Sequence, residues 1–399
     1  MPVVHCSSRG VPCGAARRAA RLPPGGRSME HSSLQTRLEQ LAAPMALGER
    51  LPGGKVRCVA CGHRCLIPEG HAGVCKVRFN RGGQLFGPRG YVAGLQDDPI
   101  EKKPFYHALP GTRALSFGML GCDFHCGYCQ NWITSQALRD GAAGTPVHAI
   151  SAEEIVVQAR SRGTLTLTST YNEPLITSEW AMEIFDMAKN AGLFTSYVSN
   201  GNASQEVIDY IRPKVDFYKI DLKGFDDKRY RKLGGTLQQI LDGIARVHAA
   251  GLWLEIVTLI VPGFNDGDEE LRNLAGFIAS LSPDIPWHVT AFHPDYRMCD
   301  PGRTPAAALL RAHGIGKAAG LHFVYAGNLP GQVQHTENTY CPHCDALLVE
   351  RMGFAVRQYT LRDGCCPRCQ ARIAGFWHTA QTGQHLHYAQ RAHVMRVSL

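Results

Sequence analysis

Short apolar runs alternate with helix-like segments along residues 114–327, and this alternation constrains the fold more than any other feature. The predicted strands, each bounded by turn residues, lie at 114–120, 165–171, 194–200, 217–223, 253–261, 288–294 and 322–327. The predicted helices begin near 151 and 178 or span 204–212, 237–250, 268–281 and 305–319. Largely apolar strands that alternate with helices predict a parallel sheet covered by helices.

We therefore predict an α/β fold in the form of a partial (β/α)6 TIM-type barrel. An open doubly wound sheet is the alternative, and it is less favoured because no Gly-rich phosphate loop follows the first strand. Ser151 and Glu154 have the spacing of a capping box and mark the start of one helix.

The composition divides the chain into five predicted parts. They are a disordered or wrongly started tail at 1–50, a Cys-rich metal-binding region at 51–112, the barrel at 113–333, a zinc-ribbon-like domain at 334–380 and a tail at 381–399. The Arg-rich residues 1–29 have the composition of a transit peptide, of a disordered extension or of sequence upstream of a true start at Met29. Their composition favours the last two interpretations.

The net charge of +8 does not indicate a nucleic-acid partner, because most of it lies in residues 1–29. This segment holds five arginines and no acidic residue, so the rest of the chain carries only 8 − 5 = +3. No apolar run approaches the roughly 20 residues that a membrane helix needs. We expect a cytoplasmic protein with no membrane partner.

Most of the 15 cysteines fall into three tight groups, at 58–75, 122–129 and 341–369. A secreted disulfide scaffold would be short and would spread its cysteines more evenly. Close groups of cysteines in a long chain indicate metal sites in a reducing compartment.

The central group follows the first predicted strand in a C-x3-C-x2-C pattern, Cys122, Cys126 and Cys129. Three thiolates can hold three irons of a [4Fe–4S] cluster and leave the fourth iron open for a substrate. A structural zinc would need a fourth ligand, which His125 could supply. That alternative does not explain why the motif stands directly after a barrel strand.

This loop, with the aromatic Tyr128 before its last cysteine, resembles the defining loop of the radical SAM superfamily. The resemblance implies that the open iron binds S-adenosylmethionine, and that one electron cleaves the cofactor to a 5′-deoxyadenosyl radical that takes hydrogen from a substrate. Further segments resemble the radical SAM enzyme of the AmmeMemoRadiSam system, which is similar to pyruvate formate-lyase-activating enzymes. They are the segments 98–104, 129–132, 170–174, 221–223, 261–266 and 325–328.

The resemblance also implies a set of cofactor-binding residues, each at or just beyond the carboxyl end of a predicted strand. They are Tyr128, Asn172, Glu173, Asn200, Asp221, Lys223 and His293. By resemblance Glu173 binds the amino group of S-adenosylmethionine, a role that suits a carboxylate. Asn200 either reaches the cofactor or forms the tight Asn-Gly turn.

Asp221 and Lys223 alternate along one predicted strand, so both side chains point to the same face. By resemblance they line the methionine and ribose side of the cofactor, and a structural ion pair with a neighbouring strand is the alternative. His293 resembles a histidine near the ribose, whereas we expect His288 to be a satisfied core histidine. Lys102, Lys103 and His107 lie either near the substrate or the N-terminal metal, or on a solvated face.

Two further cysteine quartets flank the predicted barrel. Cys341, Cys344, Cys366 and Cys369 form two C-x2-C pairs, which indicate a zinc ribbon, with a rubredoxin-like iron site as the alternative. Cys58, Cys61, Cys65 and Cys75 are expected to hold a second zinc, and an auxiliary [4Fe–4S] cluster is the alternative.

The sequence thus predicts a radical SAM enzyme with an unidentified substrate. A reductant such as flavodoxin or ferredoxin would supply the electron, and the resemblance implies Memo-like and AMMECR-like partner proteins. The alternatives are an activase of a glycyl-radical enzyme and a zinc-ribbon binding module without catalysis.

Overall fold

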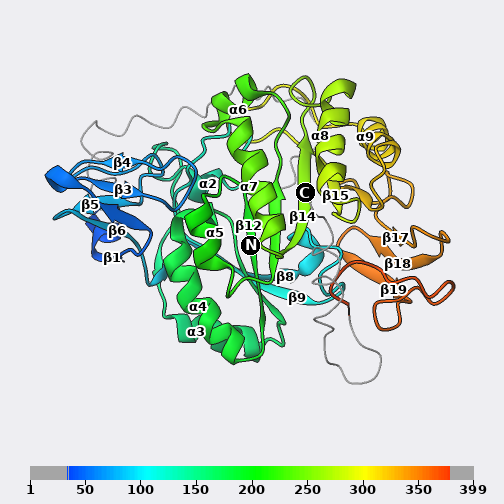
Figure 1. Ribbon diagram of the computed structural model, residues 1–399, viewed down its shortest axis with the longest axis horizontal. Helices are drawn as coiled ribbons and strands as arrows, with labels where there is room; N and C mark the ends of the chain where they lie inside the picture. Colours follow the sequence, from blue (N-terminus) through cyan, green and yellow to red (C-terminus); the bar gives the residue numbers. More distant parts are fainter. Residues whose placement is uncertain (1–33, 35, 378–399) are drawn as a thin grey trace, which may run out of the picture. The chain divides into compact units, whose positions relative to one another are not determined.

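The computed structural model describes residue 34 and residues 36–377 (Figure 1). Residues 1–33 and 35 of the predicted tail at 1–50, residues 378–380 of the predicted zinc-ribbon-like domain and the whole predicted tail at 381–399 lie outside the described residues. The chain divides into one unit at Met1–Gln40, in which residues 34 and 36–40 are helical, and a second unit at Leu41–Leu399. In the described residues no helix is both long and apolar enough to cross a membrane.

An eight-stranded sheet forms the centre of the second unit. Its strands are β8 (Gly94–Pro99), β9 (Arg113–Gly118), β11 (Thr166–Ser169), β12 (Phe194–Ser199), β13 (Phe217–Asp221), β14 (Trp253–Ile260), β15 (Trp287–Ala291) and β16 (Val324–Gly327). They lie side by side in chain order, with every pair from β9 to β16 parallel and β8 antiparallel to β9. The strand order never reverses, so the doubly wound alternative is wrong. The predicted strands are confirmed.

Six helices connect the parallel strands, at the positions that the sequence predicts (Figure 1). They are α3 (Ala152–Ser161), α4 (Ser178–Asn190), α5 (Gln205–Ile211), α7 (Leu237–Ala249), α8 (Asp268–Leu281) and α9 (Ala306–Ala318). The capping box of Ser151 and Glu154 is present at the start of α3. Because right-handed crossovers between sequential strands all run in one direction, these helices share one face of the sheet. The short helices α2 (Trp132–Ser135) and α6 (Asp227–Leu233) were not predicted.

Aromatic side chains close the amino end of the sheet. Phe194, Phe217 and Trp253 start neighbouring strands and belong to one buried cluster with Phe105 and Phe376. Polar side chains gather at the opposite end of the sheet, where the carboxyl ends of the strands lie.

A buried polar network lies next to this aromatic cluster. Glu255 accepts hydrogen bonds from the backbone N–H groups of Tyr106 and His107, both at 2.9 Å, and contacts His288 Nε2 at 2.7 Å. His288 is therefore a satisfied core histidine, as predicted. The expectation that His107 lies near the substrate, the N-terminal metal or solvent is wrong, because this side chain is fully buried and bonds to Ala374 and Tyr325.

Short strands of the segments 42–92 and 148–149 form three small sheets. They are β1 (Ala42–Pro44), β6 (Gln84–Pro88) and β5 (Phe79–Arg81), then β2 (Gly48–Arg50), β3 (Val56–Cys58) and β4 (Leu66–Ile67), and the pair β7 (Tyr91–Val92) and β10 (His148–Ala149). The expectation that a disordered tail extends to residue 50 is wrong for β1 and β2. These strands have three residues each, too few to show an apolar alternation.

The C-terminal segment folds into a three-stranded sheet of β17 (Thr339–Tyr340), β18 (Leu347–Met352) and β19 (Ala355–Tyr359). Its apolar side chains share a buried cluster with Tyr106 and Tyr325. Arg351 is buried and donates to the carbonyl oxygen of Tyr106 at 2.8 Å. The C-terminal sheet is thus packed against the same network that contains Glu255.

Candidate active site

The three central cysteines lie on the loop that leaves the carboxyl end of β9, as the sequence predicts. Gly121 turns the chain into this loop with a φ of +93°, a conformation that disfavours side chains. A Cβ at this position would also lie 2.8 Å from Val77 Cγ1, so the loop passes directly against the Cys-rich region.

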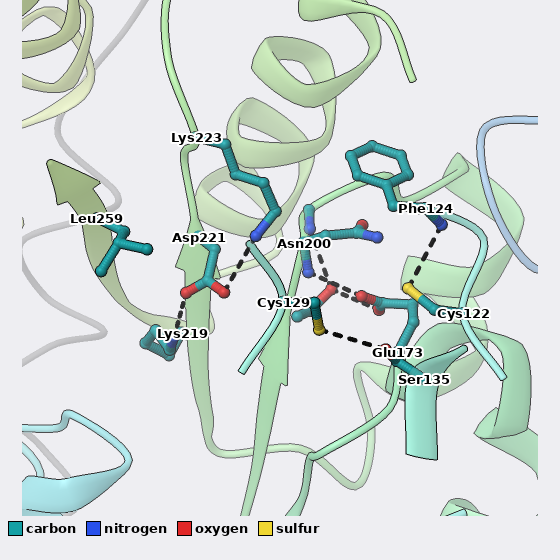
Figure 2. A network of polar contacts seen from close by, with 12 residues as sticks. Cys122, Phe124, Cys129, Ser135, Glu173, Asn200, Lys219, Asp221, Lys223 and Leu259 are labelled. Atoms are coloured by element: carbon teal, nitrogen blue, oxygen red, sulfur yellow. Dashed lines mark hydrogen bonds and ion pairs between the residues drawn. The ribbon is translucent and has the colours of Figure 1, made fainter. Parts of the chain in front are cut away.

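Two of the three sulfur atoms of this loop have a hydrogen-bond partner, as Figure 2 shows. The backbone N–H of Phe124 donates to Cys122 Sγ at 3.3 Å, and Ser135 Oγ lies 3.2 Å from Cys129 Sγ. Burial raises the pKa of the Cys126 thiol to about 12, although the ammonium of Lys223 opposes this effect. The iron ions of a cluster would stabilise the thiolate forms that burial disfavours. The three residues therefore fit an iron–sulfur cluster.

The alternative of a zinc site completed by His125 finds no support. Among the described residues, the three thiols and His125 are not a group whose ligand atoms lie within 4.8 Å of one another. A Cβ on Gly234 would lie 2.8 Å from the His125 ring, so that ring lies against the end of α6.

Glu173 follows β11 and is held by three donors of the chain; Figure 2 labels Glu173 and one of the donors, Asn200. Its carboxylate accepts from Ser199 Oγ at 2.7 Å, from the Asn200 N–H at 2.8 Å and from the Leu175 N–H at 3.2 Å. Burial, together with the negative charge of Asp123, raises the pKa of Glu173 to about 8. A cationic group placed beside this carboxylate would favour its ionised form.

Asn200 has two structural tasks in this arrangement. Its Nδ2 donates to Asp123 Oδ1 at 2.7 Å, and its Oδ1 accepts from the Asn202 N–H at 2.9 Å. Gly201 turns the chain with a φ of +80°. Asn200 therefore forms the predicted tight turn together with Gly201, and it also links β12 to the cluster loop.

Asn172 and Tyr171 fix the chain beside the cluster loop. Asn172 Oδ1 accepts from the Met119 N–H at 2.9 Å, at the point where β9 leads into the loop. Tyr171 has a φ of +70° and receives a hydrogen bond from Lys103 Nζ at 3.2 Å. The strained backbone of Tyr171 is typical of residues at functional sites.

Asp221 stands between two lysines on one face of β13 and its extension (Figure 2). Lys223 Nζ donates to Asp221 Oδ2 at 3.3 Å, and Lys219 Nζ donates to the other oxygen. Burial alone would raise the pKa of Asp221, but the two ammonium groups lower it. The shared face is confirmed, and the pairing runs along one strand rather than to a neighbouring strand.

Tyr128 belongs to the end of the cluster loop, and His293 contacts the residue that follows the loop. The buried Tyr128 ring packs edge-to-face on Phe264, with the centroids 5.8 Å apart. His293 follows β15, is exposed, and has its Nδ1 at 3.2 Å from Gln130 Nε2, next to Cys129. The structure thus places both residues at the cluster loop.

The structure brings the predicted cofactor residues together at the carboxyl ends of the strands. Three further residues of this site were not singled out from the sequence, namely Asp123, Lys219 and Asn202. Lys219 stands two positions before Asp221 in the same strand, so the alternation rule could have identified it. Asp123 and Asn202 carried no sequence signal, because the bond between them joins positions 79 residues apart.

The C-terminal quartet is the clearest metal geometry in the described residues. The Sγ atoms of Cys341, Cys344, Cys366 and Cys369 all lie within 4.8 Å of one another. The sulfurs of Cys341 and Cys369 are 3.5 Å apart, and those of Cys344 and Cys366 are 3.6 Å apart. A tetrahedral zinc with bonds of about 2.3 Å needs sulfurs separated by about 3.8 Å, so these thiols fit a single ion.

Comparison with known proteins identifies a family for this chain. The sequence profile described as the Radical SAM superfamily matches residues 118–275. The chain is 37% identical over 308 residues to the uncharacterized protein MJ0808 of Methanocaldococcus jannaschii, a match that covers 77% of this chain and 90% of that protein.

Relatives with a named activity are more distant. The chain is 26% identical over 181 residues to the pyruvate formate-lyase-activating enzyme of Clostridium pasteurianum, covering 43% of this chain and 71% of that protein. It is 28% identical over 142 residues to the isethionate sulfite-lyase activating enzyme of Oleidesulfovibrio alaskensis, covering 34% of this chain and only 45% of that protein.

Among solved structures, a radical SAM methyltransferase from Sphaerobacter thermophilus is 16% identical with a TM-score of 0.43, over 79% of this chain and 84% of that one. The family assignment rests on the sequence matches and on the three-cysteine loop after β9. The chain belongs to the radical SAM superfamily and has relatives that are named pyruvate formate-lyase-activating enzymes.

Proposed function

We propose that this chain is an enzyme that binds a [4Fe–4S] cluster on Cys122, Cys126 and Cys129 and cleaves S-adenosylmethionine reductively. When bound, the cluster and cofactor supply a 5′-deoxyadenosyl radical that takes hydrogen from a substrate not yet identified. The observation that carries the proposal is the loop of three cysteines beside Glu173, Asp221 and Lys223. We further propose that the sheet curves into the partial barrel that the sequence predicts.

The charges around the loop suit the two charged groups of the methionine part of the cofactor. The Glu173 carboxylate is buried and rigidly held, so it can accept a hydrogen bond from an ammonium group without rearranging. Lys219 and Lys223 share the single carboxylate of Asp221, which leaves one positive charge unbalanced in this trio. We propose that the ligand carboxylate balances it.

The other predicted residues have proposed roles as well. Tyr128, Asn172, Asn200 and His293 would shape the pocket for the adenosine part. Cys341, Cys344, Cys366 and Cys369 would hold a structural zinc, whose binding energy also stabilises the fold. The proposed setting is the cytoplasm, with flavodoxin or ferredoxin as the electron donor and Memo-like and AMMECR-like proteins as partners.

The direct test is anaerobic reconstitution with iron and sulfide, followed by dithionite and S-adenosylmethionine. We expect the wild type to release 5′-deoxyadenosine and Cys126→Ala to release none. Cys299→Ala is the matched control, because Cys299 is an exposed thiol outside the cluster loop, and it should behave like the wild type. A wild-type protein that takes up no iron–sulfur cluster would refute the proposal.

Activation of a glycyl-radical enzyme is the second candidate, favoured by the names of several relatives. Such an activase takes its hydrogen atom from a backbone glycine of another protein. Incubation with a candidate glycyl-radical enzyme should then give a protein-centred organic radical in the electron paramagnetic resonance spectrum. Release of 5′-deoxyadenosine with no protein radical would favour a small substrate.

A further inference from the structure

The N-terminal quartet of Cys58, Cys61, Cys65 and Cys75 differs from the C-terminal quartet in the spacing of its thiols. Among the described residues, it is not a group of ligand atoms that all lie within 4.8 Å of one another, whereas the C-terminal quartet is. A single tetrahedral ion needs sulfurs about 3.8 Å apart. The three thiols of the cluster loop at 122–129 likewise do not form a group whose ligand atoms all lie within 4.8 Å of one another.

A buried arginine approaches the N-terminal thiols, because Arg78 Nη1 lies 4.0 Å from Cys58 Sγ. A cationic side chain beside four thiolates offsets part of their negative charge.

The turn between Cys61 and Cys65 lies directly against the cluster loop. The N–H of Gly62 donates to the carbonyl oxygen of Asn202 at 2.8 Å, and a Cβ on Gly62 would lie 2.3 Å from Asn202 Oδ1. His63 Nε2 is buried and lies 3.9 Å from Asp123 Oδ2. Asp123 follows Cys122 directly, so the turn reaches the first cluster ligand through one residue.

Asp123 connects this turn to the cofactor residues. Its side chain is 0% exposed and accepts from Asn200 Nδ2 at 2.7 Å and from Asn202 Nδ2 at 2.8 Å. The backbone N–H of Asn200 in turn donates to Glu173. A displacement of the Cys61–Cys65 turn would therefore disturb the cluster loop and the Glu173 carboxylate together.

We propose that Cys58, Cys61, Cys65 and Cys75 bind a second iron–sulfur cluster, and that this cluster holds the cluster loop in place through His63 and Asp123. Four thiolates complete the ligand set, so the second cluster has no open iron and binds no substrate. Its role is to position the catalytic loop. The inference does not depend on cleavage of S-adenosylmethionine.

The first test measures iron, sulfide and zinc in the triple variant Cys122→Ser, Cys126→Ser and Cys129→Ser after anaerobic reconstitution. We expect about four irons and four sulfides to remain per chain, together with about one zinc in the C-terminal quartet. Loss of all iron with about two zincs per chain would show a zinc site and overturn the proposal. Loss of iron with one zinc would also overturn it, because the quartet would then hold neither metal.

The second test measures hydrogen exchange in the otherwise wild-type chain with Cys61→Ser and Cys65→Ser, and Cys299→Ser as the control. We expect exchange at 121–125 and 199–204 to become at least several-fold faster, with residues 339–359 unchanged. His63→Gln should give a smaller increase in the same segments. Unchanged exchange at 121–125 in the double variant would overturn the positioning role, whatever the activity of the enzyme.

Discussion

Glu255→Gln tests whether the buried network at the amino end of the sheet stabilises the fold. The carboxylate is 0% exposed and has four partners, the N–H groups of Tyr106 and His107, Trp253 Nε1 at 3.0 Å and His288 Nε2. Burial alone would raise the pKa of Glu255, but the hydrogen bond from His288 helps to lower it. The group is therefore ionised at neutral pH.

In the glutamine variant one carboxylate oxygen becomes an amide group that cannot accept a hydrogen bond. At least one buried backbone N–H then loses its acceptor, which costs about 1–3 kcal/mol. The remaining bonds lose the strengthening that a charged acceptor gives, so the total is about 3 kcal/mol. Unfolding entropy scales with length at about 2 cal/mol/K per residue, so the midpoint of thermal unfolding should fall by about 4 °C.

The assay is thermal unfolding of the reconstituted protein, with Glu183→Gln as the matched control. Glu183 forms an exposed pair with Arg89 at 2.9 Å, and exposed pairs contribute at most about 1 kcal/mol. Iron content should be unchanged in both variants, since neither residue contacts the cluster loop. Equal midpoints for Glu255→Gln and Glu183→Gln would refute the stabilising role of the network.

Three further predictions concern other charged or metal-binding side chains. Lys219→Met should lower the free energy of unfolding by only about 1 kcal/mol in a thermal unfolding assay, because Asp221 keeps its ion pair with Lys223 and part of its hydration. On the proposed function the same change should weaken the binding of S-adenosylmethionine, which calorimetry can measure. On the proposed function, Cys344→Ser should abolish zinc binding and speed hydrogen exchange in β17–β19 while iron content stays constant. Burial lowers the pKa of His107 to about 4, so below about pH 6.5 the unfolded chain binds a proton that the folded chain does not. The free energy of unfolding should therefore decrease as the pH falls below about 6.5, and at pH 5 it should be lower by about 2 kcal/mol. His107→Gln should flatten this dependence, as urea titrations at several pH values can show.

The strands and helices of the central sheet could be predicted because each carries its own local pattern. Apolar runs such as that of β14 stay recognisable even with Glu255 inside them, and capping residues such as Ser151 mark helix starts. The elements that were missed are short. The helix α2 has four residues, and the strands β1 and β2 have three each, so neither periodicity nor capping was available. The helix α6 has seven residues and is capped by Asp226, so in this case a capping signal was present and was missed.

The site could be predicted only where chemistry or spacing marks a residue by itself. Three cysteines at fixed spacing are specific, and Glu173 stands at the end of a predicted strand. Asp123 is different, because its importance comes from Asn200, Asn202 and His63, which lie far away in the sequence. Likewise nothing near His107 indicates burial, which comes from contacts with Ala374 and Tyr325.

The two ends of the sheet separate stability from chemistry. At the amino end, charged groups are enclosed and bonded to backbone groups, so changing them alters the free energy of unfolding. At the carboxyl end, Glu173 is held by hydrogen bonds from Ser199 and Asn200 of the chain itself. A carboxylate that is already fixed needs little rearrangement when a ligand binds, and such preorganisation strengthens electrostatic interactions. On the proposed function, Ser199→Ala should therefore weaken S-adenosylmethionine binding by several-fold even though Ser199 need not touch the cofactor.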